Sequence, residues 1–204
     1  VDVILGGRYE TWLTNDVIFP SNVCDDLVVA VEIGGDMNGL VPTGTDAAMN
    51  GATVIAQMAS FPATVTSTQE AKLDIQYRSK HLLAGIVMAA PGTGESTTDN
   101  VFTGLCMAAE NGTVLASQEQ ANALAVSEID VDHMANLRRK TGSFGGSAFA
   151  YSVADWGTEE AETVLTRYNY KNPHLPALEK DVPAYCQRMI DIQVDALVHR
   201  MEYA

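Results

Sequence analysis

The sequence predicts an α/β fold, and three features of the chain support this prediction. Short runs of apolar and β-branched residues, each bounded by turn residues, predict buried strands. A segment with helical periodicity lies between two of these runs, and strand, helix and strand in this order are typical of an α/β unit. Two further runs joined by an Asn-Gly turn predict a hairpin. The predicted strands are residues 27–33, 52–58, 85–90, 113–116 and 125–129, and the predicted helix is residues 67–83.

The predicted helix has a recognisable start and one apolar stripe. Ser67 and Glu70 have the spacing of a capping box, in which the two side chains satisfy backbone amides of the first turn. Leu73, Tyr77 and Ala84 fall near one stripe at helical spacing. We therefore expect this stripe to pack against the sheet.

The hairpin is predicted over residues 101–118, where Glu110, Asn111 and Gly112 join two apolar runs. Asn and Gly accept the positive φ angles that a tight hairpin turn requires. Further on, residues 142–157 are rich in Gly, Ser and aromatic residues. This segment is expected to be a loop that contains one short strand.

Both ends of the chain have the character of elements of a larger protein. Residues 1–5 begin directly as an apolar, β-branched strand. Residues 172–183 carry three prolines and predict a linker. The segment that follows places apolar side chains on two neighbouring stripes of a helix, which requires a packing partner. The expected organisation is a partial domain at 1–171, the linker at 172–183 and a terminal helix at 184–204.

The composition is that of a folded, acidic protein. The chain has 204 residues, of which 47% are hydrophobic and 19% charged, and this suffices for a buried core. Its 26 acidic and 12 basic residues give a formal net charge of −14, so nucleic acids and anionic membranes are not expected as partners. The basic run of Arg138, Arg139 and Lys140 is expected to be a solvated helix end without a function.

The cysteines and histidines do not predict a metal site. Cys24, Cys106 and Cys186 are odd in number and widely spaced, which is typical of reduced thiols in a cytoplasmic protein. The four histidines also lack the spacing of metal ligands. The segment 130–133 has the composition of a metal cluster, but alternation at a strand end is expected to place its two Asp side chains on one face beside solvent. No apolar stretch approaches the ~20 residues that a membrane helix needs, so no membrane anchor is expected.

A loop rich in glycine and hydroxyl residues follows the strand predicted at 85–90. Residues 92–99 lack the lysine of a phosphate-binding loop, so they do not predict nucleotide binding. Instead, Ser96, Thr97, Thr98 and Asp99 are expected to bond nearby backbone amides. A structured loop at the end of a strand is a suitable wall for a pocket.

The motif GESTTD at 94–99, followed by the ENG turn at 110–112, resembles the glutaminase domain of glutamine-dependent NAD synthases, a branch of the nitrilase superfamily. Four further stretches resemble that family in order along the chain. The resemblance implies the C-terminal portion of a nitrilase-like α-β-β-α sandwich, ending in a helix similar to the first helix of the synthetase domain. The four stretches are LVVAVEIGGD at 27–36, NGATVIA at 50–56, residues 128–144 and residues 185–197.

In the family, a Glu-Lys-Cys triad hydrolyses glutamine, and the released ammonia converts deamido-NAD to NAD at the synthetase site. The resemblance places Gly34 at the nucleophilic Cys and Gly35 at a neighbouring Glu, and only Asp36 of this turn is retained. The family's Glu and Lys belong to strands that would precede Val1. Cys24 lies before the strand and is a poor substitute for the nucleophile, as is Cys106 in the hairpin.

The resemblance also identifies remnants of the glutamine pocket. Phe61 stands where the family has a small polar residue, and Ser67 where it has an arginine. With Gly35, Asp36, Glu95 and Ser96, these residues make up the expected remnant of the substrate pocket. No catalytic residue is retained in this set.

Three hypotheses about function follow. In the first, the chain is part of a glutamine-dependent NAD synthase whose glutaminase layer is inactive and acts as a scaffold and interaction surface. In the second, it is a nitrilase-like amidase that uses Glu95, Ser96 and Asp99. In the third, it is a stand-alone interaction protein whose partner supplies the missing strands.

The expected partners follow from the first hypothesis. They are a synthetase domain or a partner chain, together with further copies of this chain in a homo-oligomer. The resemblance implies no cofactor in this chain, because ATP and deamido-NAD would bind only to an adjoining synthetase domain.

Overall fold

The computed structural model divides the chain into two compact units, Val1–Thr163 and Val164–Ala204. The structure describes residues 2–5, 9–12, 14–97, 99–119, 124–144, 150–160, 164–168, 172, 174–176 and 178–203.

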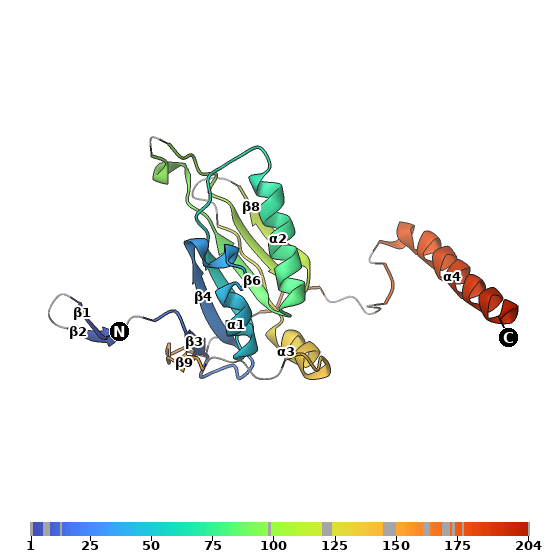
Figure 1. The fold of residues 1–204 in the computed structure, drawn as a ribbon, viewed down its shortest axis with the longest axis horizontal. Coiled ribbons are helices and arrows are strands. Elements are labelled where there is room, and N and C mark those ends of the chain that lie inside the picture. Colours follow the sequence, from blue (N-terminus) through green and yellow to red (C-terminus); the bar gives the residue numbers. More distant parts are fainter. Residues whose placement is uncertain are drawn as a thin grey trace. The chain divides into compact units, whose positions relative to one another are not determined.

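A seven-stranded mixed sheet forms the centre of the first unit, with the strand order β8-β7-β6-β5-β4-β3-β9 (Figure 1). Neighbours are parallel within β4-β5-β6 and antiparallel within β6-β7-β8. This arrangement confirms the predicted α/β class. The strands are β3 (Val17–Pro20), β4 (Val28–Ile33), β5 (Val54–Met58), β6 (Gly85–Ala89), β7 (Cys106–Glu110), β8 (Thr113–Gln118) and β9 (Ser152–Val153). A separate antiparallel hairpin consists of β1 (Asp2–Leu5) and β2 (Tyr9–Trp12), which confirms a strand at the start of the chain.

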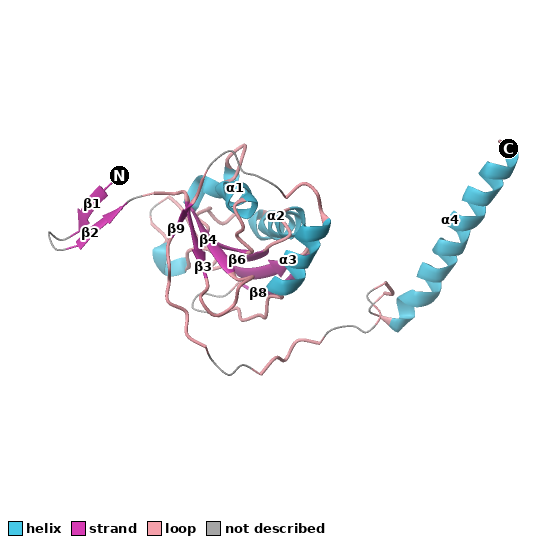
Figure 2. Cartoon of the chain, turned by 90° about the horizontal axis from the view of Figure 1, so that it is seen from below, coloured by secondary structure: helices cyan, strands magenta, loops and turns pink. Residues whose placement is uncertain are grey.

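The helices α1 (Thr43–Met49) and α2 (Ser67–His81) lie on the same side of this sheet (Figures 1 and 2). Inward-facing side chains of β5, β6 and β7 fill the space below α2 and form the main core. The largest fully buried apolar side chains there are Ile55, Ile75, Ile86, Met88, Leu105 and Met107.

The opposite side of the sheet is apolar and partly open to solvent. Val31, Ala56 and Val87 are in register across β4, β5 and β6, and Ile33, Met58 and Ala89 form the next row. Val31, Ile33, Met58 and Val87 are all exposed. We call this surface, made by the side chains of these two rows, the apolar sheet face.

The strand predicted at 125–129 is wrong. Residues 124–130 are irregular and lead into α3 (Val131–Lys140), for which Asp130 provides the N-cap by accepting a hydrogen bond from the His133 N–H. Ile129 lies close against Gly85, where a Cβ atom would approach its Cγ2 to 2.6 Å. The apolar residues of this segment therefore reflect packing against the sheet and not strand pairing.

The stripe predicted for α2 is also wrong. Leu73 and Tyr77 are 57% and 66% exposed, whereas the buried side of the helix carries Ala71, Ile75 and Ser79. The small side chains of Ala71 and Ser79 allow the helix backbone to approach the sheet closely, while Ile75 fills the core between them. Ala84, beyond the helix end, is buried as expected.

The capping box predicted at the start of α2 does not form. Thr66 is the N-cap residue, and no side chain caps the first turn. The Ser67 hydroxyl instead accepts a hydrogen bond from the Thr64 N–H and donates to the Thr64 carbonyl, both at 3.1 Å. Ser67 thus closes the turn before the helix.

The predicted hairpin is confirmed. β7 and β8 pair antiparallel around Asn111 and Gly112, whose φ angles are +46° and +83°. The Ser79 hydroxyl accepts a hydrogen bond from the Gly112 N–H at 3.0 Å, which ties the turn to α2. The short strand expected within residues 142–157 is β9, although residues 145–149 lie outside the described part of the chain.

Arg138 is not the solvated residue that the sequence suggested. Its Nε donates to the Leu83 carbonyl at 2.9 Å, and its Nη2 donates to the carbonyls of Ala52 (2.7 Å) and Leu82 (3.0 Å). The guanidinium lies 5.0 Å from the centre of the Phe144 ring, and burial lowers its pKa to about 10. Arg138 therefore joins α3 to the ends of two other helices. Arg139, in contrast, is an exposed partner of Asp26.

The second unit contains the long helix α4 (Val182–Glu202), which confirms the predicted terminal helix. Pro183 lies in its first turn, where the missing backbone N–H is not needed. Both predicted apolar stripes are exposed, including Ile190, Val194 and Leu197. Within the part of the chain that the structure describes, no helix is long and apolar enough to cross a membrane.

Candidate functional site

The turn after β4 is the first element of the site. Gly34 directly follows the strand, has a φ of +58° and opens the 3-10 helix η1 (Gly34–Asn38). This strand-turn-helix arrangement resembles the sharp elbow that presents a nucleophile in α/β-hydrolases. The Asp36 carboxylate accepts a hydrogen bond from the Ile33 N–H at 3.3 Å and thereby fixes the turn. No atom lies within 4 Å of the Cβ positions of Gly34 and Gly35.

A cavity of about 350 Å³ adjoins this turn. The structure brings the predicted pocket residues Phe61 and Ser67 together in its wall, next to Met37 and Asn38 of η1. Phe61 is half-buried against the main core, and Ser67 is buried with its hydroxyl engaged by Thr64. Two of the six positions that the resemblance assigned to the pocket therefore share one cavity.

Glu95 and Ser96 belong to a different loop, which begins with the 3-10 helix η2 (Thr93–Glu95). The Ser96 hydroxyl accepts a hydrogen bond from the Phe102 N–H at 3.2 Å, as expected for a residue that stabilises its own loop. The Glu95 side chain is exposed. These contacts show a structured loop and do not place either side chain at the turn after β4.

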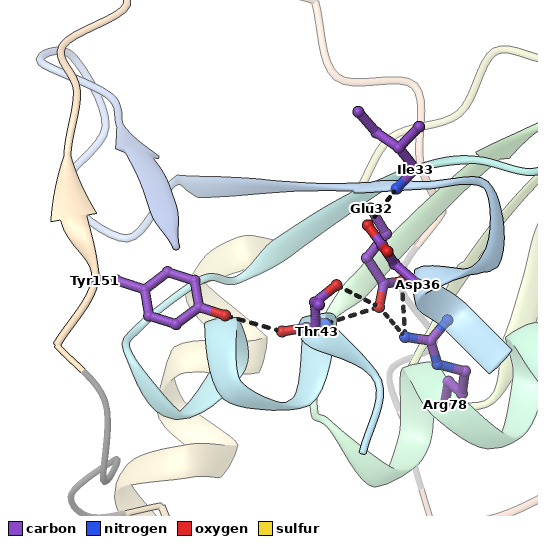
Figure 3. Close-up of polar contacts among 7 residues, drawn as sticks. Glu32, Ile33, Asp36, Thr43, Arg78 and Tyr151 are labelled. Atoms are coloured by element: carbon purple, nitrogen blue, oxygen red, sulfur yellow. Dashed lines mark hydrogen bonds and ion pairs between the residues drawn. The ribbon is translucent and has the colours of Figure 1, made fainter. Parts of the chain in front are cut away.

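A buried ion pair lies directly below this turn, and sequence reasoning missed it. Arg78 Nη2 donates to Glu32 Oε1 at 2.8 Å and to Oε2 at 2.7 Å, and both side chains are almost fully buried (Figure 3). The Gly44 N–H donates to the same Oε1 at 2.7 Å, and the Thr43 hydroxyl donates at 3.5 Å. The pair therefore connects β4, α1 and α2. The available signal was a glutamate in the middle of an apolar strand.

Two titratable groups lie near this pair. Tyr151 donates its hydroxyl to the Thr43 carbonyl at 3.2 Å, and burial, followed by the charges of Asp46, Asp16 and Glu32, raises its pKa to about 12 (Figure 3). Burial also raises the pKa of Asp74, with a further increase from Glu32 and an opposing effect of Arg78. The surroundings of Glu32 thus carry more negative than positive charge.

A second cavity, of about 500 Å³, lies between α2 and the segment 37–42. We call it the α2 groove. Asp74, Tyr77, Arg78 and His81, which occupy one side of α2, line it. The rings of Tyr77 and His81 stack with centroids 5.4 Å apart and planes inclined by 10°. The exposure of Tyr77 therefore places an aromatic surface on the groove.

The site does not resemble a metal centre. Within the residues that the structure describes, no cluster of three or more His, Cys, Asp or Glu side chains could hold a metal ion. Cys24 and Cys106 are half-buried free thiols, and Cys186 is an exposed one.

The chain was compared with known families, curated proteins and solved structures. No family model matches it. The glutamine-dependent NAD(+) synthetase of Mycobacterium leprae is 30% identical over 91% of this chain, and that of Mycobacterium tuberculosis is 29% identical over the same share. The chain is a homologue of glutamine-dependent NAD(+) synthetases. It spans 29% of the length of these relatives.

The fold of this synthetase homologue is also found in a solved synthetase. The structure of glutamine-dependent NAD+ synthetase from Acinetobacter baumannii superposes with a TM-score of 0.51 and 18% identity, over 63% of this chain and 24% of that chain. A member of the nitrilase superfamily, Nit3 of Saccharomyces cerevisiae, matches with a TM-score of 0.49 over 60% of this chain. The superposition on the Acinetobacter baumannii structure confirms the fold class expected from the resemblance.

The geometry of the synthetase homologue limits which thiol could act at the turn after β4. Cys106 is in the same cross-strand row as Ile33, but β7 is three strands away from β4, a distance of about 14 Å at ordinary strand spacing. Cys24 lies in the turn before β4, where its N–H donates to the Ser21 hydroxyl. Neither thiol reaches the position of Gly34.

Gly44 offers a test of the buried pair in the synthetase homologue. A Cβ atom at this position would lie 2.8 Å from Glu32 Oε1 and 3.0 Å from Arg78 Nη2. We expect Gly44→Ala to lower the free energy of unfolding by about 1 to 3 kcal/mol, because the carboxylate is fixed on several sides and has to move. Urea denaturation followed by circular dichroism measures this loss. Gly94→Ala, where the added Cβ meets no atom within 4 Å, is the matched control.

Proposed function

We propose that the chain forms the glutaminase-type layer of a protein related to NAD synthetases, and that this layer does not hydrolyse glutamine. One observation carries the proposal: Gly34 occupies the tip of the turn after β4, where the resemblance places the nucleophilic cysteine. Hydrolysis of an amide through a covalent intermediate requires a nucleophilic side chain, which glycine lacks.

The cavity next to the turn supports the same proposal. Phe61 fills volume where the resemblance implies a small polar residue, and Ser67 cannot provide the charge of the implied arginine. The Ser67 hydroxyl is in addition already engaged with Thr64. A glutamine molecule would therefore lose both space and charged contacts in this pocket.

The proposed role of the layer is that of a scaffold and contact surface. The apolar sheet face supports this role, since exposed apolar patches of this kind mark interaction sites. We propose a synthetase domain, a partner chain or further copies of this chain as partners. ATP and deamido-NAD would bind the synthetase domain, and no residue of this chain is assigned to them. Free thiols at Cys24, Cys106 and Cys186 support a reducing, cytoplasmic location.

The proposed domain organisation follows from the same resemblance. Residues 1–171 would belong to a partial glutaminase domain, residues 172–183 would be a linker, and residues 184–204 would open the synthetase domain. The chain divides into two compact units between Thr163 and Val164, close to the first of these boundaries.

The experiment is an assay of glutamine hydrolysis. The chain is incubated with glutamine, and ammonia and glutamate are measured, with the glutamine-dependent NAD(+) synthetase of Mycobacterium tuberculosis assayed in parallel. We expect no release above that of a protein-free blank. Release that rises with protein concentration and disappears in Glu95→Gln or Ser96→Ala would overturn the proposal and support the amidase hypothesis.

A gain-of-function series tests the assignment of the three positions. Gly34→Cys alone is compared with Gly34→Cys combined with Phe61→Ser and Ser67→Arg, using a glutamine analogue that carries a thiol-reactive diazoketone. We expect mass spectrometry to show faster labelling at position 34 in the triple variant, because its pocket regains space and charge. Equal labelling of both variants would contradict the assignment of Phe61 and Ser67 to the pocket.

A further inference from the structure

We propose that the α2 groove binds a free α-amino acid with an apolar or aromatic side chain. This site adjoins the cavity lined by Phe61 and Ser67 and shares Met37, Asn38 and Asp74 with it. Arg78 and residues 39–42 line the groove and not that cavity. The proposal goes beyond the proposed function, because it concerns binding and requires no hydrolysis.

The first argument is an unpaired donor on Arg78. Its Nη2 is occupied by Glu32, whereas its Nη1 is buried and has no hydrogen-bond partner within the described part of the chain. The Arg78 side chain is 7% exposed and lines the groove. Figure 3 shows the free terminal nitrogen directed away from Glu32, on the side of η1. A buried N–H without an acceptor is costly, so an oxygen atom of a ligand in the groove would stabilise this group.

The second argument is the position of Asp74. It lies four residues before Arg78 on the same helix, so the two side chains share one side of α2. Asp74 is half-buried and lines the groove, so its carboxylate contributes to the net charge of the site together with Glu32 and Arg78. Glu32 and Arg78 compensate each other, which leaves the Asp74 carboxylate as the uncompensated charge.

This charge distribution selects the class of ligand. A simple carboxylate could accept from Arg78 Nη1 but would add a second negative charge next to Asp74, which is unfavourable at low local dielectric. A simple amine could bind Asp74 but would leave Arg78 Nη1 unpaired. An α-amino acid supplies both an acceptor for Arg78 and an ammonium group for Asp74, with no change in net charge.

The third argument concerns the side chain of the ligand. Leu40, Val41 and Tyr77 line the same groove and are 106%, 64% and 66% exposed, which is unusual for large apolar residues that lie together. The stacked ring of His81 extends the flat surface of Tyr77. A volume of about 500 Å³ is within the usual range for small-molecule sites. An apolar ligand side chain would therefore cover this wall.

The experiment is calorimetric titration of the full 204-residue chain with leucine and with two fragments of leucine. 4-Methylpentanoate lacks the ammonium group, and 3-methylbutylamine lacks the carboxylate. We expect leucine to bind at least tenfold more tightly than either fragment, and glutamine to bind more weakly than leucine because its amide would be desolvated against Leu40 and Val41. Equal affinity for leucine and 4-methylpentanoate would overturn the proposal. Tighter binding of glutamine than of leucine would overturn it as well.

Two variants locate the binding. Asp74→Asn is expected to weaken leucine binding about tenfold and to leave the affinity for 4-methylpentanoate unchanged or higher. Arg78→Lys keeps a charge for Glu32 but removes the second terminal nitrogen, and it is expected to weaken leucine binding by a similar factor. Asp132→Asn, on α3 and outside the groove lining, is the matched control.

Circular dichroism establishes that each variant is folded. Absence of leucine binding by the folded parent chain at about 10 mM ligand would overturn the proposal, as would an unchanged affinity in Asp74→Asn. The ammonia assay is a separate measurement. Absence of leucine binding would therefore not contradict the proposed function, and hydrolysis of glutamine would not contradict leucine binding.

Discussion

Replacing Arg78 by methionine is expected to lower the free energy of unfolding by about 3 to 5 kcal/mol. The substitution keeps much of the side-chain volume but leaves the Glu32 carboxylate buried without its cation. The Gly44 N–H would remain as a donor, and one amide cannot replace a guanidinium that contacts both carboxylate oxygens. Urea denaturation monitored by circular dichroism gives the difference from the parent chain.

The double variant Glu32→Gln with Arg78→Met is the control for this prediction. It removes the uncompensated charge and retains a carbonyl oxygen that accepts from Gly44, so we expect it to be more stable than Arg78→Met alone. A single variant within about 1 kcal/mol of the parent, or a double variant less stable than the single one, would show that the pair contributes little to the fold.

Replacing Arg138 by methionine is expected to cost about 3 kcal/mol or more of unfolding free energy. The carbonyls of Ala52, Leu82 and Leu83 would lose the donor that they share, and the contact with the Phe144 ring would be lost as well. Leu83 has a φ of +46°, an unfavourable angle for leucine, and the hydrogen bond from Arg138 holds it there. Thermal and urea denaturation measure the effect.

The neighbouring residue provides the control for this experiment. Arg139 forms an exposed ion pair with Asp26 at 3.0 Å, and such pairs contribute about 1 kcal/mol or less. Arg139→Met is therefore expected to have a small effect. Equal losses for the variants at 138 and 139 would contradict the role assigned to Arg138.

Most elements of the fold could be predicted from the sequence because their signals are local. The alternating and β-branched runs of β4, β5 and β6, and the Asn111-Gly112 turn, depend on neighbouring residues alone. The segment 125–129 has the same composition but lies beside Gly85 without pairing as a strand. Composition does not distinguish an apolar strand from an apolar loop that covers a sheet.

The candidate site likewise contains residues that the sequence predicts and residues that it does not. The sequence predicts the turn at Gly34 and the positions Phe61 and Ser67 because the resemblance is carried by contiguous motifs, and Phe61 and Ser67 share one cavity in the structure. The pair of Glu32 and Arg78 joins residues 46 positions apart, and nothing near Arg78 in the sequence marks it as buried. The burial of Arg138 could not be predicted for a related reason. Its acceptors are backbone carbonyls, which leave no signal in the sequence because every residue has one.

The backbone φ angle of Gly34 affects which substitutions this turn accepts during evolution. At a φ of +58° glycine is unstrained, whereas any residue with a side chain holds this conformation at a cost of about 1 kcal/mol or more. Under the proposed function, a cysteine at this position would be kept for its chemistry, and its replacement by glycine would make the fold more stable once that chemistry is no longer selected. A substitution of Gly34 by cysteine would restore the reactive thiol at a cost in stability, and the pocket around it would also have to be restored. Under the proposed function, a return to glutamine hydrolysis would therefore be the harder direction.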